Sequence, residues 1–600
     1  MRRIARASVL PVLSALLLLV PFARGQQPPP PATPPPAPPP ADSEIEEKVT
    51  VRLAEVQILV TDRDGNPMTD LKAGEVEIRE DGEARRIAYL EPFATTGPLS
   101  KSVPQPTPVA APGEKAAIPE APVAIPNPAP QRWVVLLFDV LNSRTMDRKH
   151  WVSAARSWVS TEMRPDDRVA LMVLESEGTV RELVPFTGDH ELLAHALAED
   201  TMLDGYPHRD YTSDMRRIVE DLTETCGESR NPESCMSGAT EPIVFEWHGR
   251  GQQTLRGLTQ LSGSLGAIPG RKAVLFLGPG IVTDPRMTAA NAALSVFGTD
   301  RLSPSSAMSQ RDATLNQQLL ETTRIAATAD VSFFTMDSRP SSLRDQSTDV
   351  EQRDGMSERK LFDPFQEVFD TTRGSMDTIA IRTGGRSLHG PALDKNLPVL
   401  ARSVEGVYSL GFYRNPDSSR KPNVKVKVSR RGAVVTFPDR YDSRRDEPTT
   451  IPVEMAIGKT EGLAGGILVP VVVQARASAL VFREEEGQDV ARLSVYAEAI
   501  TPAGKREASA YQQVEVRVDL SRRGDRARMN FSHEIPLVLP PGAYRIRVRL
   551  SEISFKQVSD RSVDITLRSD GTVAPGIQES VQIQGSERPA APPAAAGRPF

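Results

Sequence analysis

Hydrophobic and polar residues alternate strictly in several short stretches of this chain. Residues 49–53 (VTVRL) alternate, residues 56–60 (VQILV) are more apolar, and Asp-Gly pairs at 64–65 and 81–82 suit turns between strands. Residues 47–94 are therefore predicted to form a small β-sandwich-like module. Residues 491–497 (ARLSVYA) and 514–518 (VEVRV) show the same alternation, which predicts an immunoglobulin-like β-sandwich over residues 451–583.

Between these modules the pattern changes to continuous apolar runs separated by helical stripes. The runs at 133–138, 169–174 and 273–277 are typical of strands buried on both faces. Trp151, Ala155 and Trp158 lie on one face of a predicted helix, and leucines at 255, 258, 261 and 265 mark another. Residues 132–441 are therefore predicted to form an α/β domain with a doubly wound, mostly parallel sheet.

Proline and the amino terminus change this picture, because 52 of the 600 residues are proline. Residues 26–46 and 95–131 are proline-rich and are predicted to be extended linkers, and residues 585–600 a disordered tail. Arg2, Arg3 and Arg6 precede an apolar run at 9–22, which predicts a signal peptide over residues 1–25. We therefore expect an exported protein, periplasmic, surface-bound or secreted, with no stable membrane span after cleavage.

Composition narrows the chemistry. With 78 acidic and 72 basic residues and no long basic run, the chain is not expected to bind nucleic acid. The only two cysteines, Cys226 and Cys235, flank a polar turn and are predicted to form a disulfide, as export favours. His533-Glu534 lacks a second histidine at helical spacing, and neither a P-loop nor a Gly-x-Ser-x-Gly elbow occurs. The prediction is a protein that is not an enzyme.

Several segments occur in the order typical of one family. They are VTDRDGNPMTDLKAGEVEIREDG (60–82), VVLLFDVLNSR (134–144), RPDDRVALMVLESEGTVRELVPFTGD (164–189), GRKAVLFLGPG (270–280), VSFFTMDSR (331–339), IRTGGRSL (381–388) and GVYSLGFYR (406–414). With them the chain resembles the von Willebrand factor A domain and, more narrowly, the VWFA-related proteins described from acidobacteria. The resemblance covers most of residues 47–441.

The resemblance implies a site for Mg²⁺ or Mn²⁺ built on Asp-x-Ser-x-Ser, a threonine and a later aspartate. Asp139 and Ser143 match its first and last positions, but Leu141 replaces the first serine. Gly278-Pro279-Gly280 replaces the later Asp-Gly, so Asp284 would have to supply the second carboxylate, and Thr201 or Thr212 the threonine. The alternative is that Asp139 and Ser143 only cap the loop and the following helix.

Three long insertions, at residues 201–249, 281–311 and 340–365, are predicted to be recognition loops. Their aromatic residues Tyr206, Tyr211, Phe245 and Trp247 either anchor a partner or pack locally. The predicted function is an exported interaction protein that binds a protein or extracellular-matrix ligand and carries a degenerate metal site. A structural cell-envelope protein is the alternative, and a hydrolase is more remote.

Overall fold

The computed structural model describes residues 52–92, 131–198, 203–302, 312–339, 363–414, 422–437, 450–552 and 557–575, except positions 204, 208, 299, 300, 464 and 486. The predicted signal peptide (1–25), the linker 26–46, residues 95–130 of the second linker and the tail 585–600 lie outside the described residues. Among the helices that are described, none combines the length and hydropathy required to cross a bilayer.

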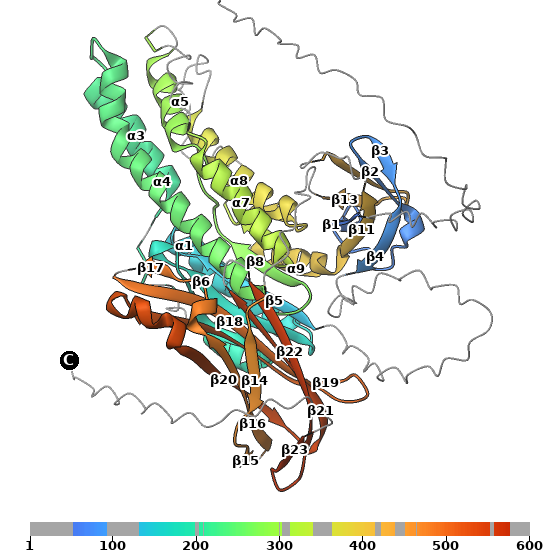
Figure 1. Ribbon diagram of the computed structural model, residues 1–600. Coiled ribbons are helices and arrows are strands. Elements are labelled where there is room, and N and C mark those ends of the chain that lie inside the picture. Colours follow the sequence, from blue (N-terminus) through green and yellow to red (C-terminus); the bar gives the residue numbers. More distant parts are fainter. Residues whose placement is uncertain are drawn as a thin grey trace, which may run out of the picture. The chain divides into compact units, whose positions relative to one another are not determined.

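The central α/β domain is built on a six-stranded sheet (Figure 1). Its order is β10 (Ser387–His389), β9 (Val331–Asp337), β8 (Lys272–Leu277), β5 (Arg132–Asp139), β6 (Asp167–Leu174) and β7 (Val180–Thr187). All neighbours are parallel except β7, which runs antiparallel to β6. The prediction of an α/β protein is confirmed, and the sheet is mixed.

Helices cover both faces of this sheet, which explains the continuous apolar runs. Val134, Leu136 and Phe138 of β5 share a buried cluster with α1 (Thr145–Thr161), α2 (His190–Ala196) and α9 (Leu393–Ser403). Val135 and Leu137 belong instead to a cluster with α4 (Pro232–Leu265), α7 (Thr314–Thr328) and α8 (Pro364–Arg382). Successive residues of β5 therefore face opposite helical layers.

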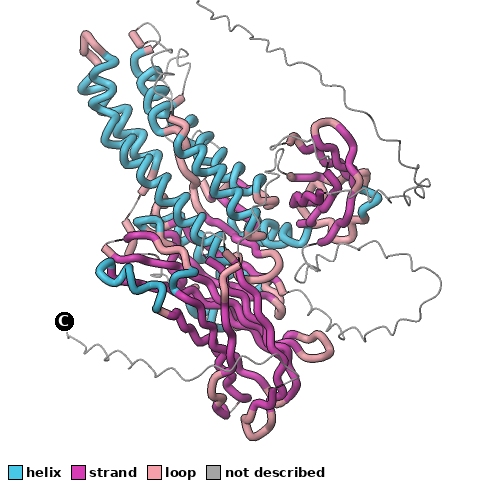
Figure 2. Tube along the Cα trace, in the orientation of Figure 1, coloured by secondary structure: helices cyan, strands magenta, loops and turns pink. Residues whose placement is uncertain are grey.

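Two of the predicted recognition loops are helical, which corrects that expectation. Figure 2 shows α3 (Tyr211–Cys226) beside the first half of α4, and α5 (Pro285–Phe297) lies against both. Together with the start of α8 they bury an apolar cluster of their own, which includes Met215, Val244, Ala289 and Val368. We call α3, the first half of α4 and α5 the helical bundle. Of the third predicted loop, residues 340–362 lie outside the described part of the chain.

The amino-terminal module is completed by residues that we assigned to the α/β domain. β1 (Arg52–Thr61) lies between β11 (Val407–Arg414) and β13 (Val434–Thr436), and β11 also pairs with β4 (Ile87–Pro92). β2 (Val76–Glu80) pairs with β3 (Glu83–Arg85) and β12 (Val424–Val428). Strands β11 to β13, which lie within the expected α/β range 132–441, therefore pack with the amino-terminal module. Their apolar residues cover those of β1 and β2.

The carboxyl-terminal module has two antiparallel sheets that share one apolar core. One contains β14 (Val453–Ile457), β15 (Glu461–Leu463), β16 (Gly466–Arg476) and β20 (Asn530–Leu539). The other contains β17 (Arg483–Glu485), β18 (Gln488–Ile500), β19 (Arg506–Asp519), β21 (Gly542–Glu552), β22 (Val558–Leu567) and β23 (Val573–Pro575). Tyr496 of β18 is buried in the same cluster as Trp133 of β5, so this module packs on the α/β domain.

Candidate functional site

The carboxyl ends of the parallel strands form the edge where open α/β sheets bind their ligands. β5 ends there at Asp139, β8 at Leu277 and β9 at Asp337. The loop after β5 carries the two residues that match the metal motif best, Asp139 and Ser143. This edge is therefore the candidate site.

Asp139 is fully buried and its carboxylate binds the loop that follows it. It accepts hydrogen bonds from the backbone N of Asn142 at 3.1 Å and from Asn142 Nδ2 at 3.2 and 3.0 Å. Burial raises the pKa of Asp139 to about 6, although the bonds from Asn142 oppose the shift. Asn142 in turn donates to Thr254 Oγ1 of α4 at 2.9 Å and accepts from the Tyr211 hydroxyl of α3 at 3.0 Å.

The Ser143 side chain is hydrogen-bonded to an arginine. Its Oγ accepts a hydrogen bond of 3.0 Å from Nε of Arg148, whose side chain is buried. The same guanidinium donates to five backbone carbonyls, those of Val140, Ser143, Leu203, Tyr206 and Pro207. Arg148 therefore holds the β5–α1 loop against residues 203–207, and it places a fixed positive charge beside the predicted metal ligands.

The second carboxylate of the motif has no room at its family position. A Cβ atom at Gly278 would lie 2.8 Å from Cβ and 3.1 Å from Oδ2 of Asp139. Asp284, the expected substitute, caps the N-terminus of α5, where it accepts from the backbone N of Met287 at 3.1 Å and of Asp312 at 3.3 Å. Asp284 is thus found as a helix cap.

These residues do not fit a divalent cation, which needs a shell of oxygen ligands. Asp139 and Ser143 already bind Asn142 and Arg148, and Thr212 lies in the first turn of α3, where its backbone N donates to Asp210. Thr201 lies outside the described residues. Across the described ranges no group of three or more His, Cys, Asp or Glu side chains is arranged to hold a metal ion.

A second buried carboxylate at this edge was missed by the sequence analysis. Asp337, at the end of β9, binds Arg339 at 2.9 and 3.0 Å and Arg373 at 3.1 Å. Although burial by itself raises its pKa, these guanidiniums hold the pKa of Asp337 below its ordinary value. Both arginines also lie over the ring of Phe369. The signal was in VSFFTMDSR, where an apolar strand ends in an aspartate followed by an arginine two residues later.

The helical bundle covers the edge beside Asp139 with polar and aromatic side chains of its own. The buried Tyr211 ring lies edge-on to Trp247 at 5.7 Å, and the guanidinium of Arg250 lies 4.5 Å from its centre. Trp247 Nε1 donates to Asp214 at 2.9 Å, and Arg250 pairs with the same carboxylate. Tyr211 and Trp247 therefore pack locally and are not free to anchor a partner.

The other two predicted aromatic residues differ from each other. The Tyr206 hydroxyl donates to Glu175 at 2.5 Å and also binds Arg181. Phe245, on α4, is 78% exposed, the largest exposed fraction recorded for a large apolar side chain among the described residues. Phe245 is thus the aromatic residue of the insertions that is presented to solvent.

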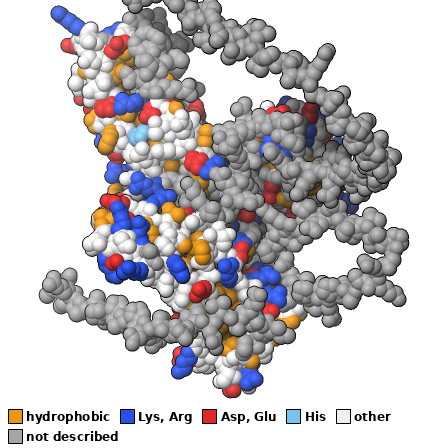
Figure 3. Space-filling view, in the orientation of Figure 1, with side chains coloured by type: hydrophobic (Ala, Val, Ile, Leu, Met, Phe, Trp, Pro, Cys, Tyr) orange, Lys and Arg blue, Asp and Glu red, His pale blue; other side chains and the backbone are white. Residues whose placement is uncertain are grey.

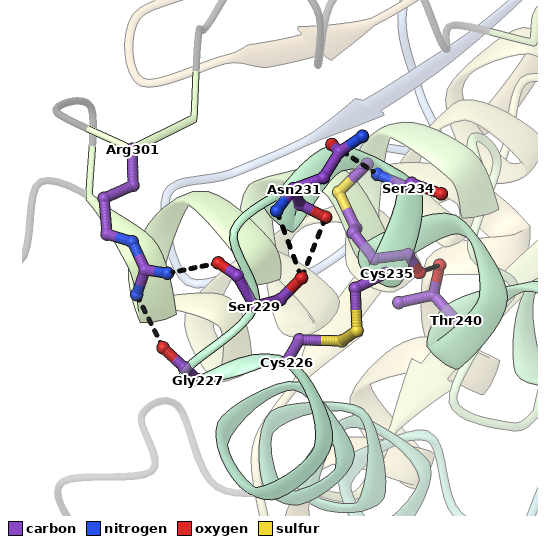
Figure 4. Close-up of a disulfide and its surroundings, with 9 residues drawn as sticks. Cys226, Gly227, Ser229, Asn231, Ser234, Cys235, Thr240 and Arg301 are labelled. Atoms are coloured by element: carbon purple, nitrogen blue, oxygen red, sulfur yellow. Dashed lines mark hydrogen bonds between the residues drawn. A yellow bond between two sulfur atoms is a disulfide. The ribbon is translucent and has the colours of Figure 1, made fainter.

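The predicted disulfide between Cys226 and Cys235 is confirmed (Figure 4). It joins the end of α3 to the first turn of α4, with a Cα–Cα distance of 5.7 Å. Arg301 donates to the carbonyl oxygens of Gly227 at 2.7 Å and Ser229 at 2.9 Å in the same turn. The end of the helical bundle far from Asp139 is therefore closed by a covalent bond and two hydrogen bonds.

Comparison with known proteins gives no assignment by sequence, since no family model and no curated protein matches the chain. A von Willebrand factor type A structure from Catenulispora acidiphila is 9% identical and covers 74% of this chain and 68% of its own, with a TM-score of 0.21. A pilus adhesin from Lactobacillus rhamnosus GG is 9% identical and covers 75% of this chain and 68% of its own, with a TM-score of 0.23. An aerotolerance-related membrane protein from Bacteroides fragilis is 11% identical and covers 46% of this chain and 98% of its own, with a TM-score of 0.20. TM-scores this low do not establish a common fold or function.

Proposed function

We propose that this chain is an exported, non-enzymatic interaction protein of the cell envelope or surface that binds a protein or extracellular-matrix partner. In this proposal a doubly wound, von Willebrand factor A-like domain stands between two β-sandwich modules. The partner contacts the helical bundle and not a metal ion at the carboxyl edge of the sheet. The observation that carries the proposal is that Asn142, Arg148 and Tyr211 fill this edge while the bundle presents Phe245.

The surroundings of Phe245 support this assignment. An exposed aromatic ring is a common energetic centre of an interface, and a rim of polar groups usually surrounds it. On α4 the neighbouring Glu241 binds Arg286 at 2.7 and 3.0 Å, and Glu246 pairs with Arg209. Glu241 and Glu246 flank Phe245 in the sequence of α4, and their ion pairs with Arg286 and Arg209 can form such a rim.

The helical bundle is also held in one shape before any partner binds. Its own apolar cluster fixes α3 against α4 and α5, and the Cys226–Cys235 bond closes its far end. A rigid surface loses less conformational entropy on binding than a mobile loop does. The helical structure found at residues 211–226 and 232–265 therefore suits recognition better than the loops that the sequence predicted.

The test is binding of the purified full chain to a panel of immobilised matrix proteins and isolated cell envelopes. We expect saturable binding that EDTA does not reduce and that Phe245→Ser weakens about tenfold or more, as loss of an aromatic anchor does. Val538→Ser is the matched control, because Val538 is 45% exposed on β20 of the carboxyl-terminal module. Saturable binding that EDTA abolishes, or that Phe245→Ser leaves unchanged, would contradict the proposal.

The second candidate, a structural envelope protein, is favoured by the buried contacts that join the modules. Trp133 and Tyr496 meet at 5.9 Å inside one core cluster, and Arg271 lies 3.9 Å from Glu55 of the amino-terminal module. Such contacts keep the modules in a fixed arrangement. Co-purification with envelopes without any saturable partner would favour this candidate over the interaction protein.

A further inference from the structure

A groove with a volume of about 1070 Å³ lies where the α/β domain faces the carboxyl-terminal module. One wall consists of one face of α4 and one face of α7, and the opposite wall of β17, β18 and β19. The turn between β6 and β7 closes one side. The volume is slightly above the range of about 300 to 1,000 Å³ that is usual for ligand pockets.

The surfaces that face each other across the groove carry both polar and apolar side chains. Beside it, Trp133, Phe186, Tyr496 and Tyr511 form edge-on ring contacts of 5.0 to 5.9 Å that join the two modules. Inside it, the helical wall presents amides, hydroxyls and charges, at Gln252, Arg256, Thr259 and Gln260 of α4 and at Gln318, Glu321 and Thr322 of α7. Closing the groove would bury these charged and amide groups, which costs free energy unless each finds a partner.

The strand wall is a pattern of alternating charges on one face of the sheet. Arg492 binds Glu485 at 2.6 Å and Glu515 at 2.7 Å, and Arg517 binds Glu515 at 2.7 Å. Arg492 and Glu515 are direct cross-strand neighbours, and Arg517 is two residues further along β19. In Figure 3 basic and acidic side chains lie intermixed over the region where Figure 1 labels β17.

Two arginines of the lining differ from the rest. Within the described residues Arg256 of α4 reaches only the carbonyl oxygen of Glu177, at 3.5 Å. Arg483 of β17 forms no salt bridge there, although Arg492 and, to a smaller extent, Arg483 lower the pKa of Glu485. They come from opposite walls of the groove. A guanidinium without a carboxylate partner is a strong binding group for an incoming carboxylate.

The turn at the side of the groove is backbone in an unusual conformation. Glu177 has a φ of 70°, in the left-handed region that non-glycine residues rarely adopt. The turn cannot relax toward α4, because a Cβ on the adjacent Gly178 would lie 2.5 Å from the carbonyl oxygen of Gln253. Strained residues of this kind are concentrated at binding sites.

We infer that this groove binds an extended peptide segment of a partner protein, with an acidic side chain of that segment held between Arg256 and Arg483. The amides of Gln252, Gln260, Gln318 and Gln513 supply donors and acceptors for a peptide backbone. Four arginines and four glutamates line the groove, at 256, 483, 492 and 517 and at 177, 321, 485 and 515. This balance disfavours a polyanion. The site is separate from Phe245 and does not depend on the function proposed above.

The test uses the full chain and a fluorescein-labelled ten-residue peptide of nine threonines and one central glutamate, measured by fluorescence polarisation. We expect saturable binding, and at least tenfold weaker binding of the matching threonine–glutamine peptide. Arg256→Gln with Arg483→Gln should weaken binding of the glutamate peptide at least tenfold. Thr259→Trp, which fills the groove without changing charge, should do the same. Arg216→Gln with Arg568→Gln is the control, because both arginines are exposed and lie outside the groove.

Melting curves of each variant separate loss of binding from loss of folding. The inference is overturned if neither peptide binds saturably, if both groove variants bind as the wild type does, or if inorganic polyphosphate binds more tightly than the peptide. A negative result here leaves the Phe245 experiment untouched, because the groove variants should retain binding to a partner of the helical bundle. If Phe245→Ser does not change partner binding, the peptide titration still tests the groove, because Phe245 is not among its lining residues.

Discussion

Replacing Arg148 with methionine should destabilise the α/β domain by about 3 to 5 kcal/mol. The side chain is 1% exposed and donates to six oxygen atoms, Ser143 Oγ and the carbonyls of Val140, Ser143, Leu203, Tyr206 and Pro207. Methionine keeps most of the apolar stem but has no donor. Each buried acceptor left without a donor costs about 1 to 3 kcal/mol, and relaxation of the 203–207 segment toward water recovers part of the sum. Removing one partner of a buried charged network typically costs about 3 to 5 kcal/mol.

Tryptophan fluorescence during urea unfolding measures this effect selectively. The four tryptophans of the chain, Trp133, Trp151, Trp158 and Trp247, all lie in the α/β domain or its helical bundle. Arg216→Met is the matched control, because Arg216 is exposed on α3 and its loss should change the free energy of unfolding by less than about 0.5 kcal/mol. An Arg148→Met protein as stable as this control would refute the role given to Arg148.

Three further predictions concern the same domain. Gly278→Ala should cost about 1 to 3 kcal/mol in urea unfolding, because its Cβ would press on Asp139; a wild-type midpoint would contradict this. A carboxyl with a raised pKa is stabilised as pH falls, so between pH 8 and pH 5 the wild type should gain about 1.4 kcal/mol over Asp139→Asn, and equal slopes would refute the shift. Cys226→Ser with Cys235→Ser should cost about 2 to 3 kcal/mol and raise hydrogen exchange at the ends of α3 and α4 but not in β5; uniform exchange changes would contradict local closure.

The local parts of the fold were predictable from the sequence. Apolar runs identified β5, β6 and β8 because strands buried on both faces have no polar alternation. The disulfide was predictable because a cysteine count of two leaves one pairing, and the expected export favours an oxidised pair. The amino-terminal module was incomplete because β1 pairs with β11, some 350 residues later, and periodicity contains no information on such pairings.

The insertions were read as loops for a different reason. Residues 201–249 contain Gly, Pro and many charged residues, and their apolar positions face a core that forms only when α5 and α8 are added. Helical stability in such a segment comes from tertiary packing more than from intrinsic propensity. The local sequence pattern therefore did not predict the helices of the helical bundle.

Of the candidate site, the sequence identified Asp139 and Ser143 but not the side chains that bind them. Asp139 was found because it ends an apolar strand, but its neighbours Asn142, Tyr211 and Thr254 are brought together by three different elements. Arg148 was not identified from the sequence, since nothing in the local pattern showed that residues 203–207 would cover it. The Asp139 carboxylate accepts a hydrogen bond from the backbone N of Asn142, as the alternative expected. The Ser143 hydroxyl instead accepts from the Arg148 side chain and not from a backbone amide of the helix.

Calorimetric titration of the full chain with Mn²⁺ and Mg²⁺, beside an Asp139→Ala variant, tests most directly whether the carboxyl edge of the sheet is closed. Asp139 and Ser143 accept hydrogen bonds from Asn142 and Arg148. We therefore expect the wild type and the variant to give the same heats, with no saturable binding that depends on Asp139. Saturable binding by the wild type that the variant loses would contradict it and return the metal ion to the centre of partner recognition.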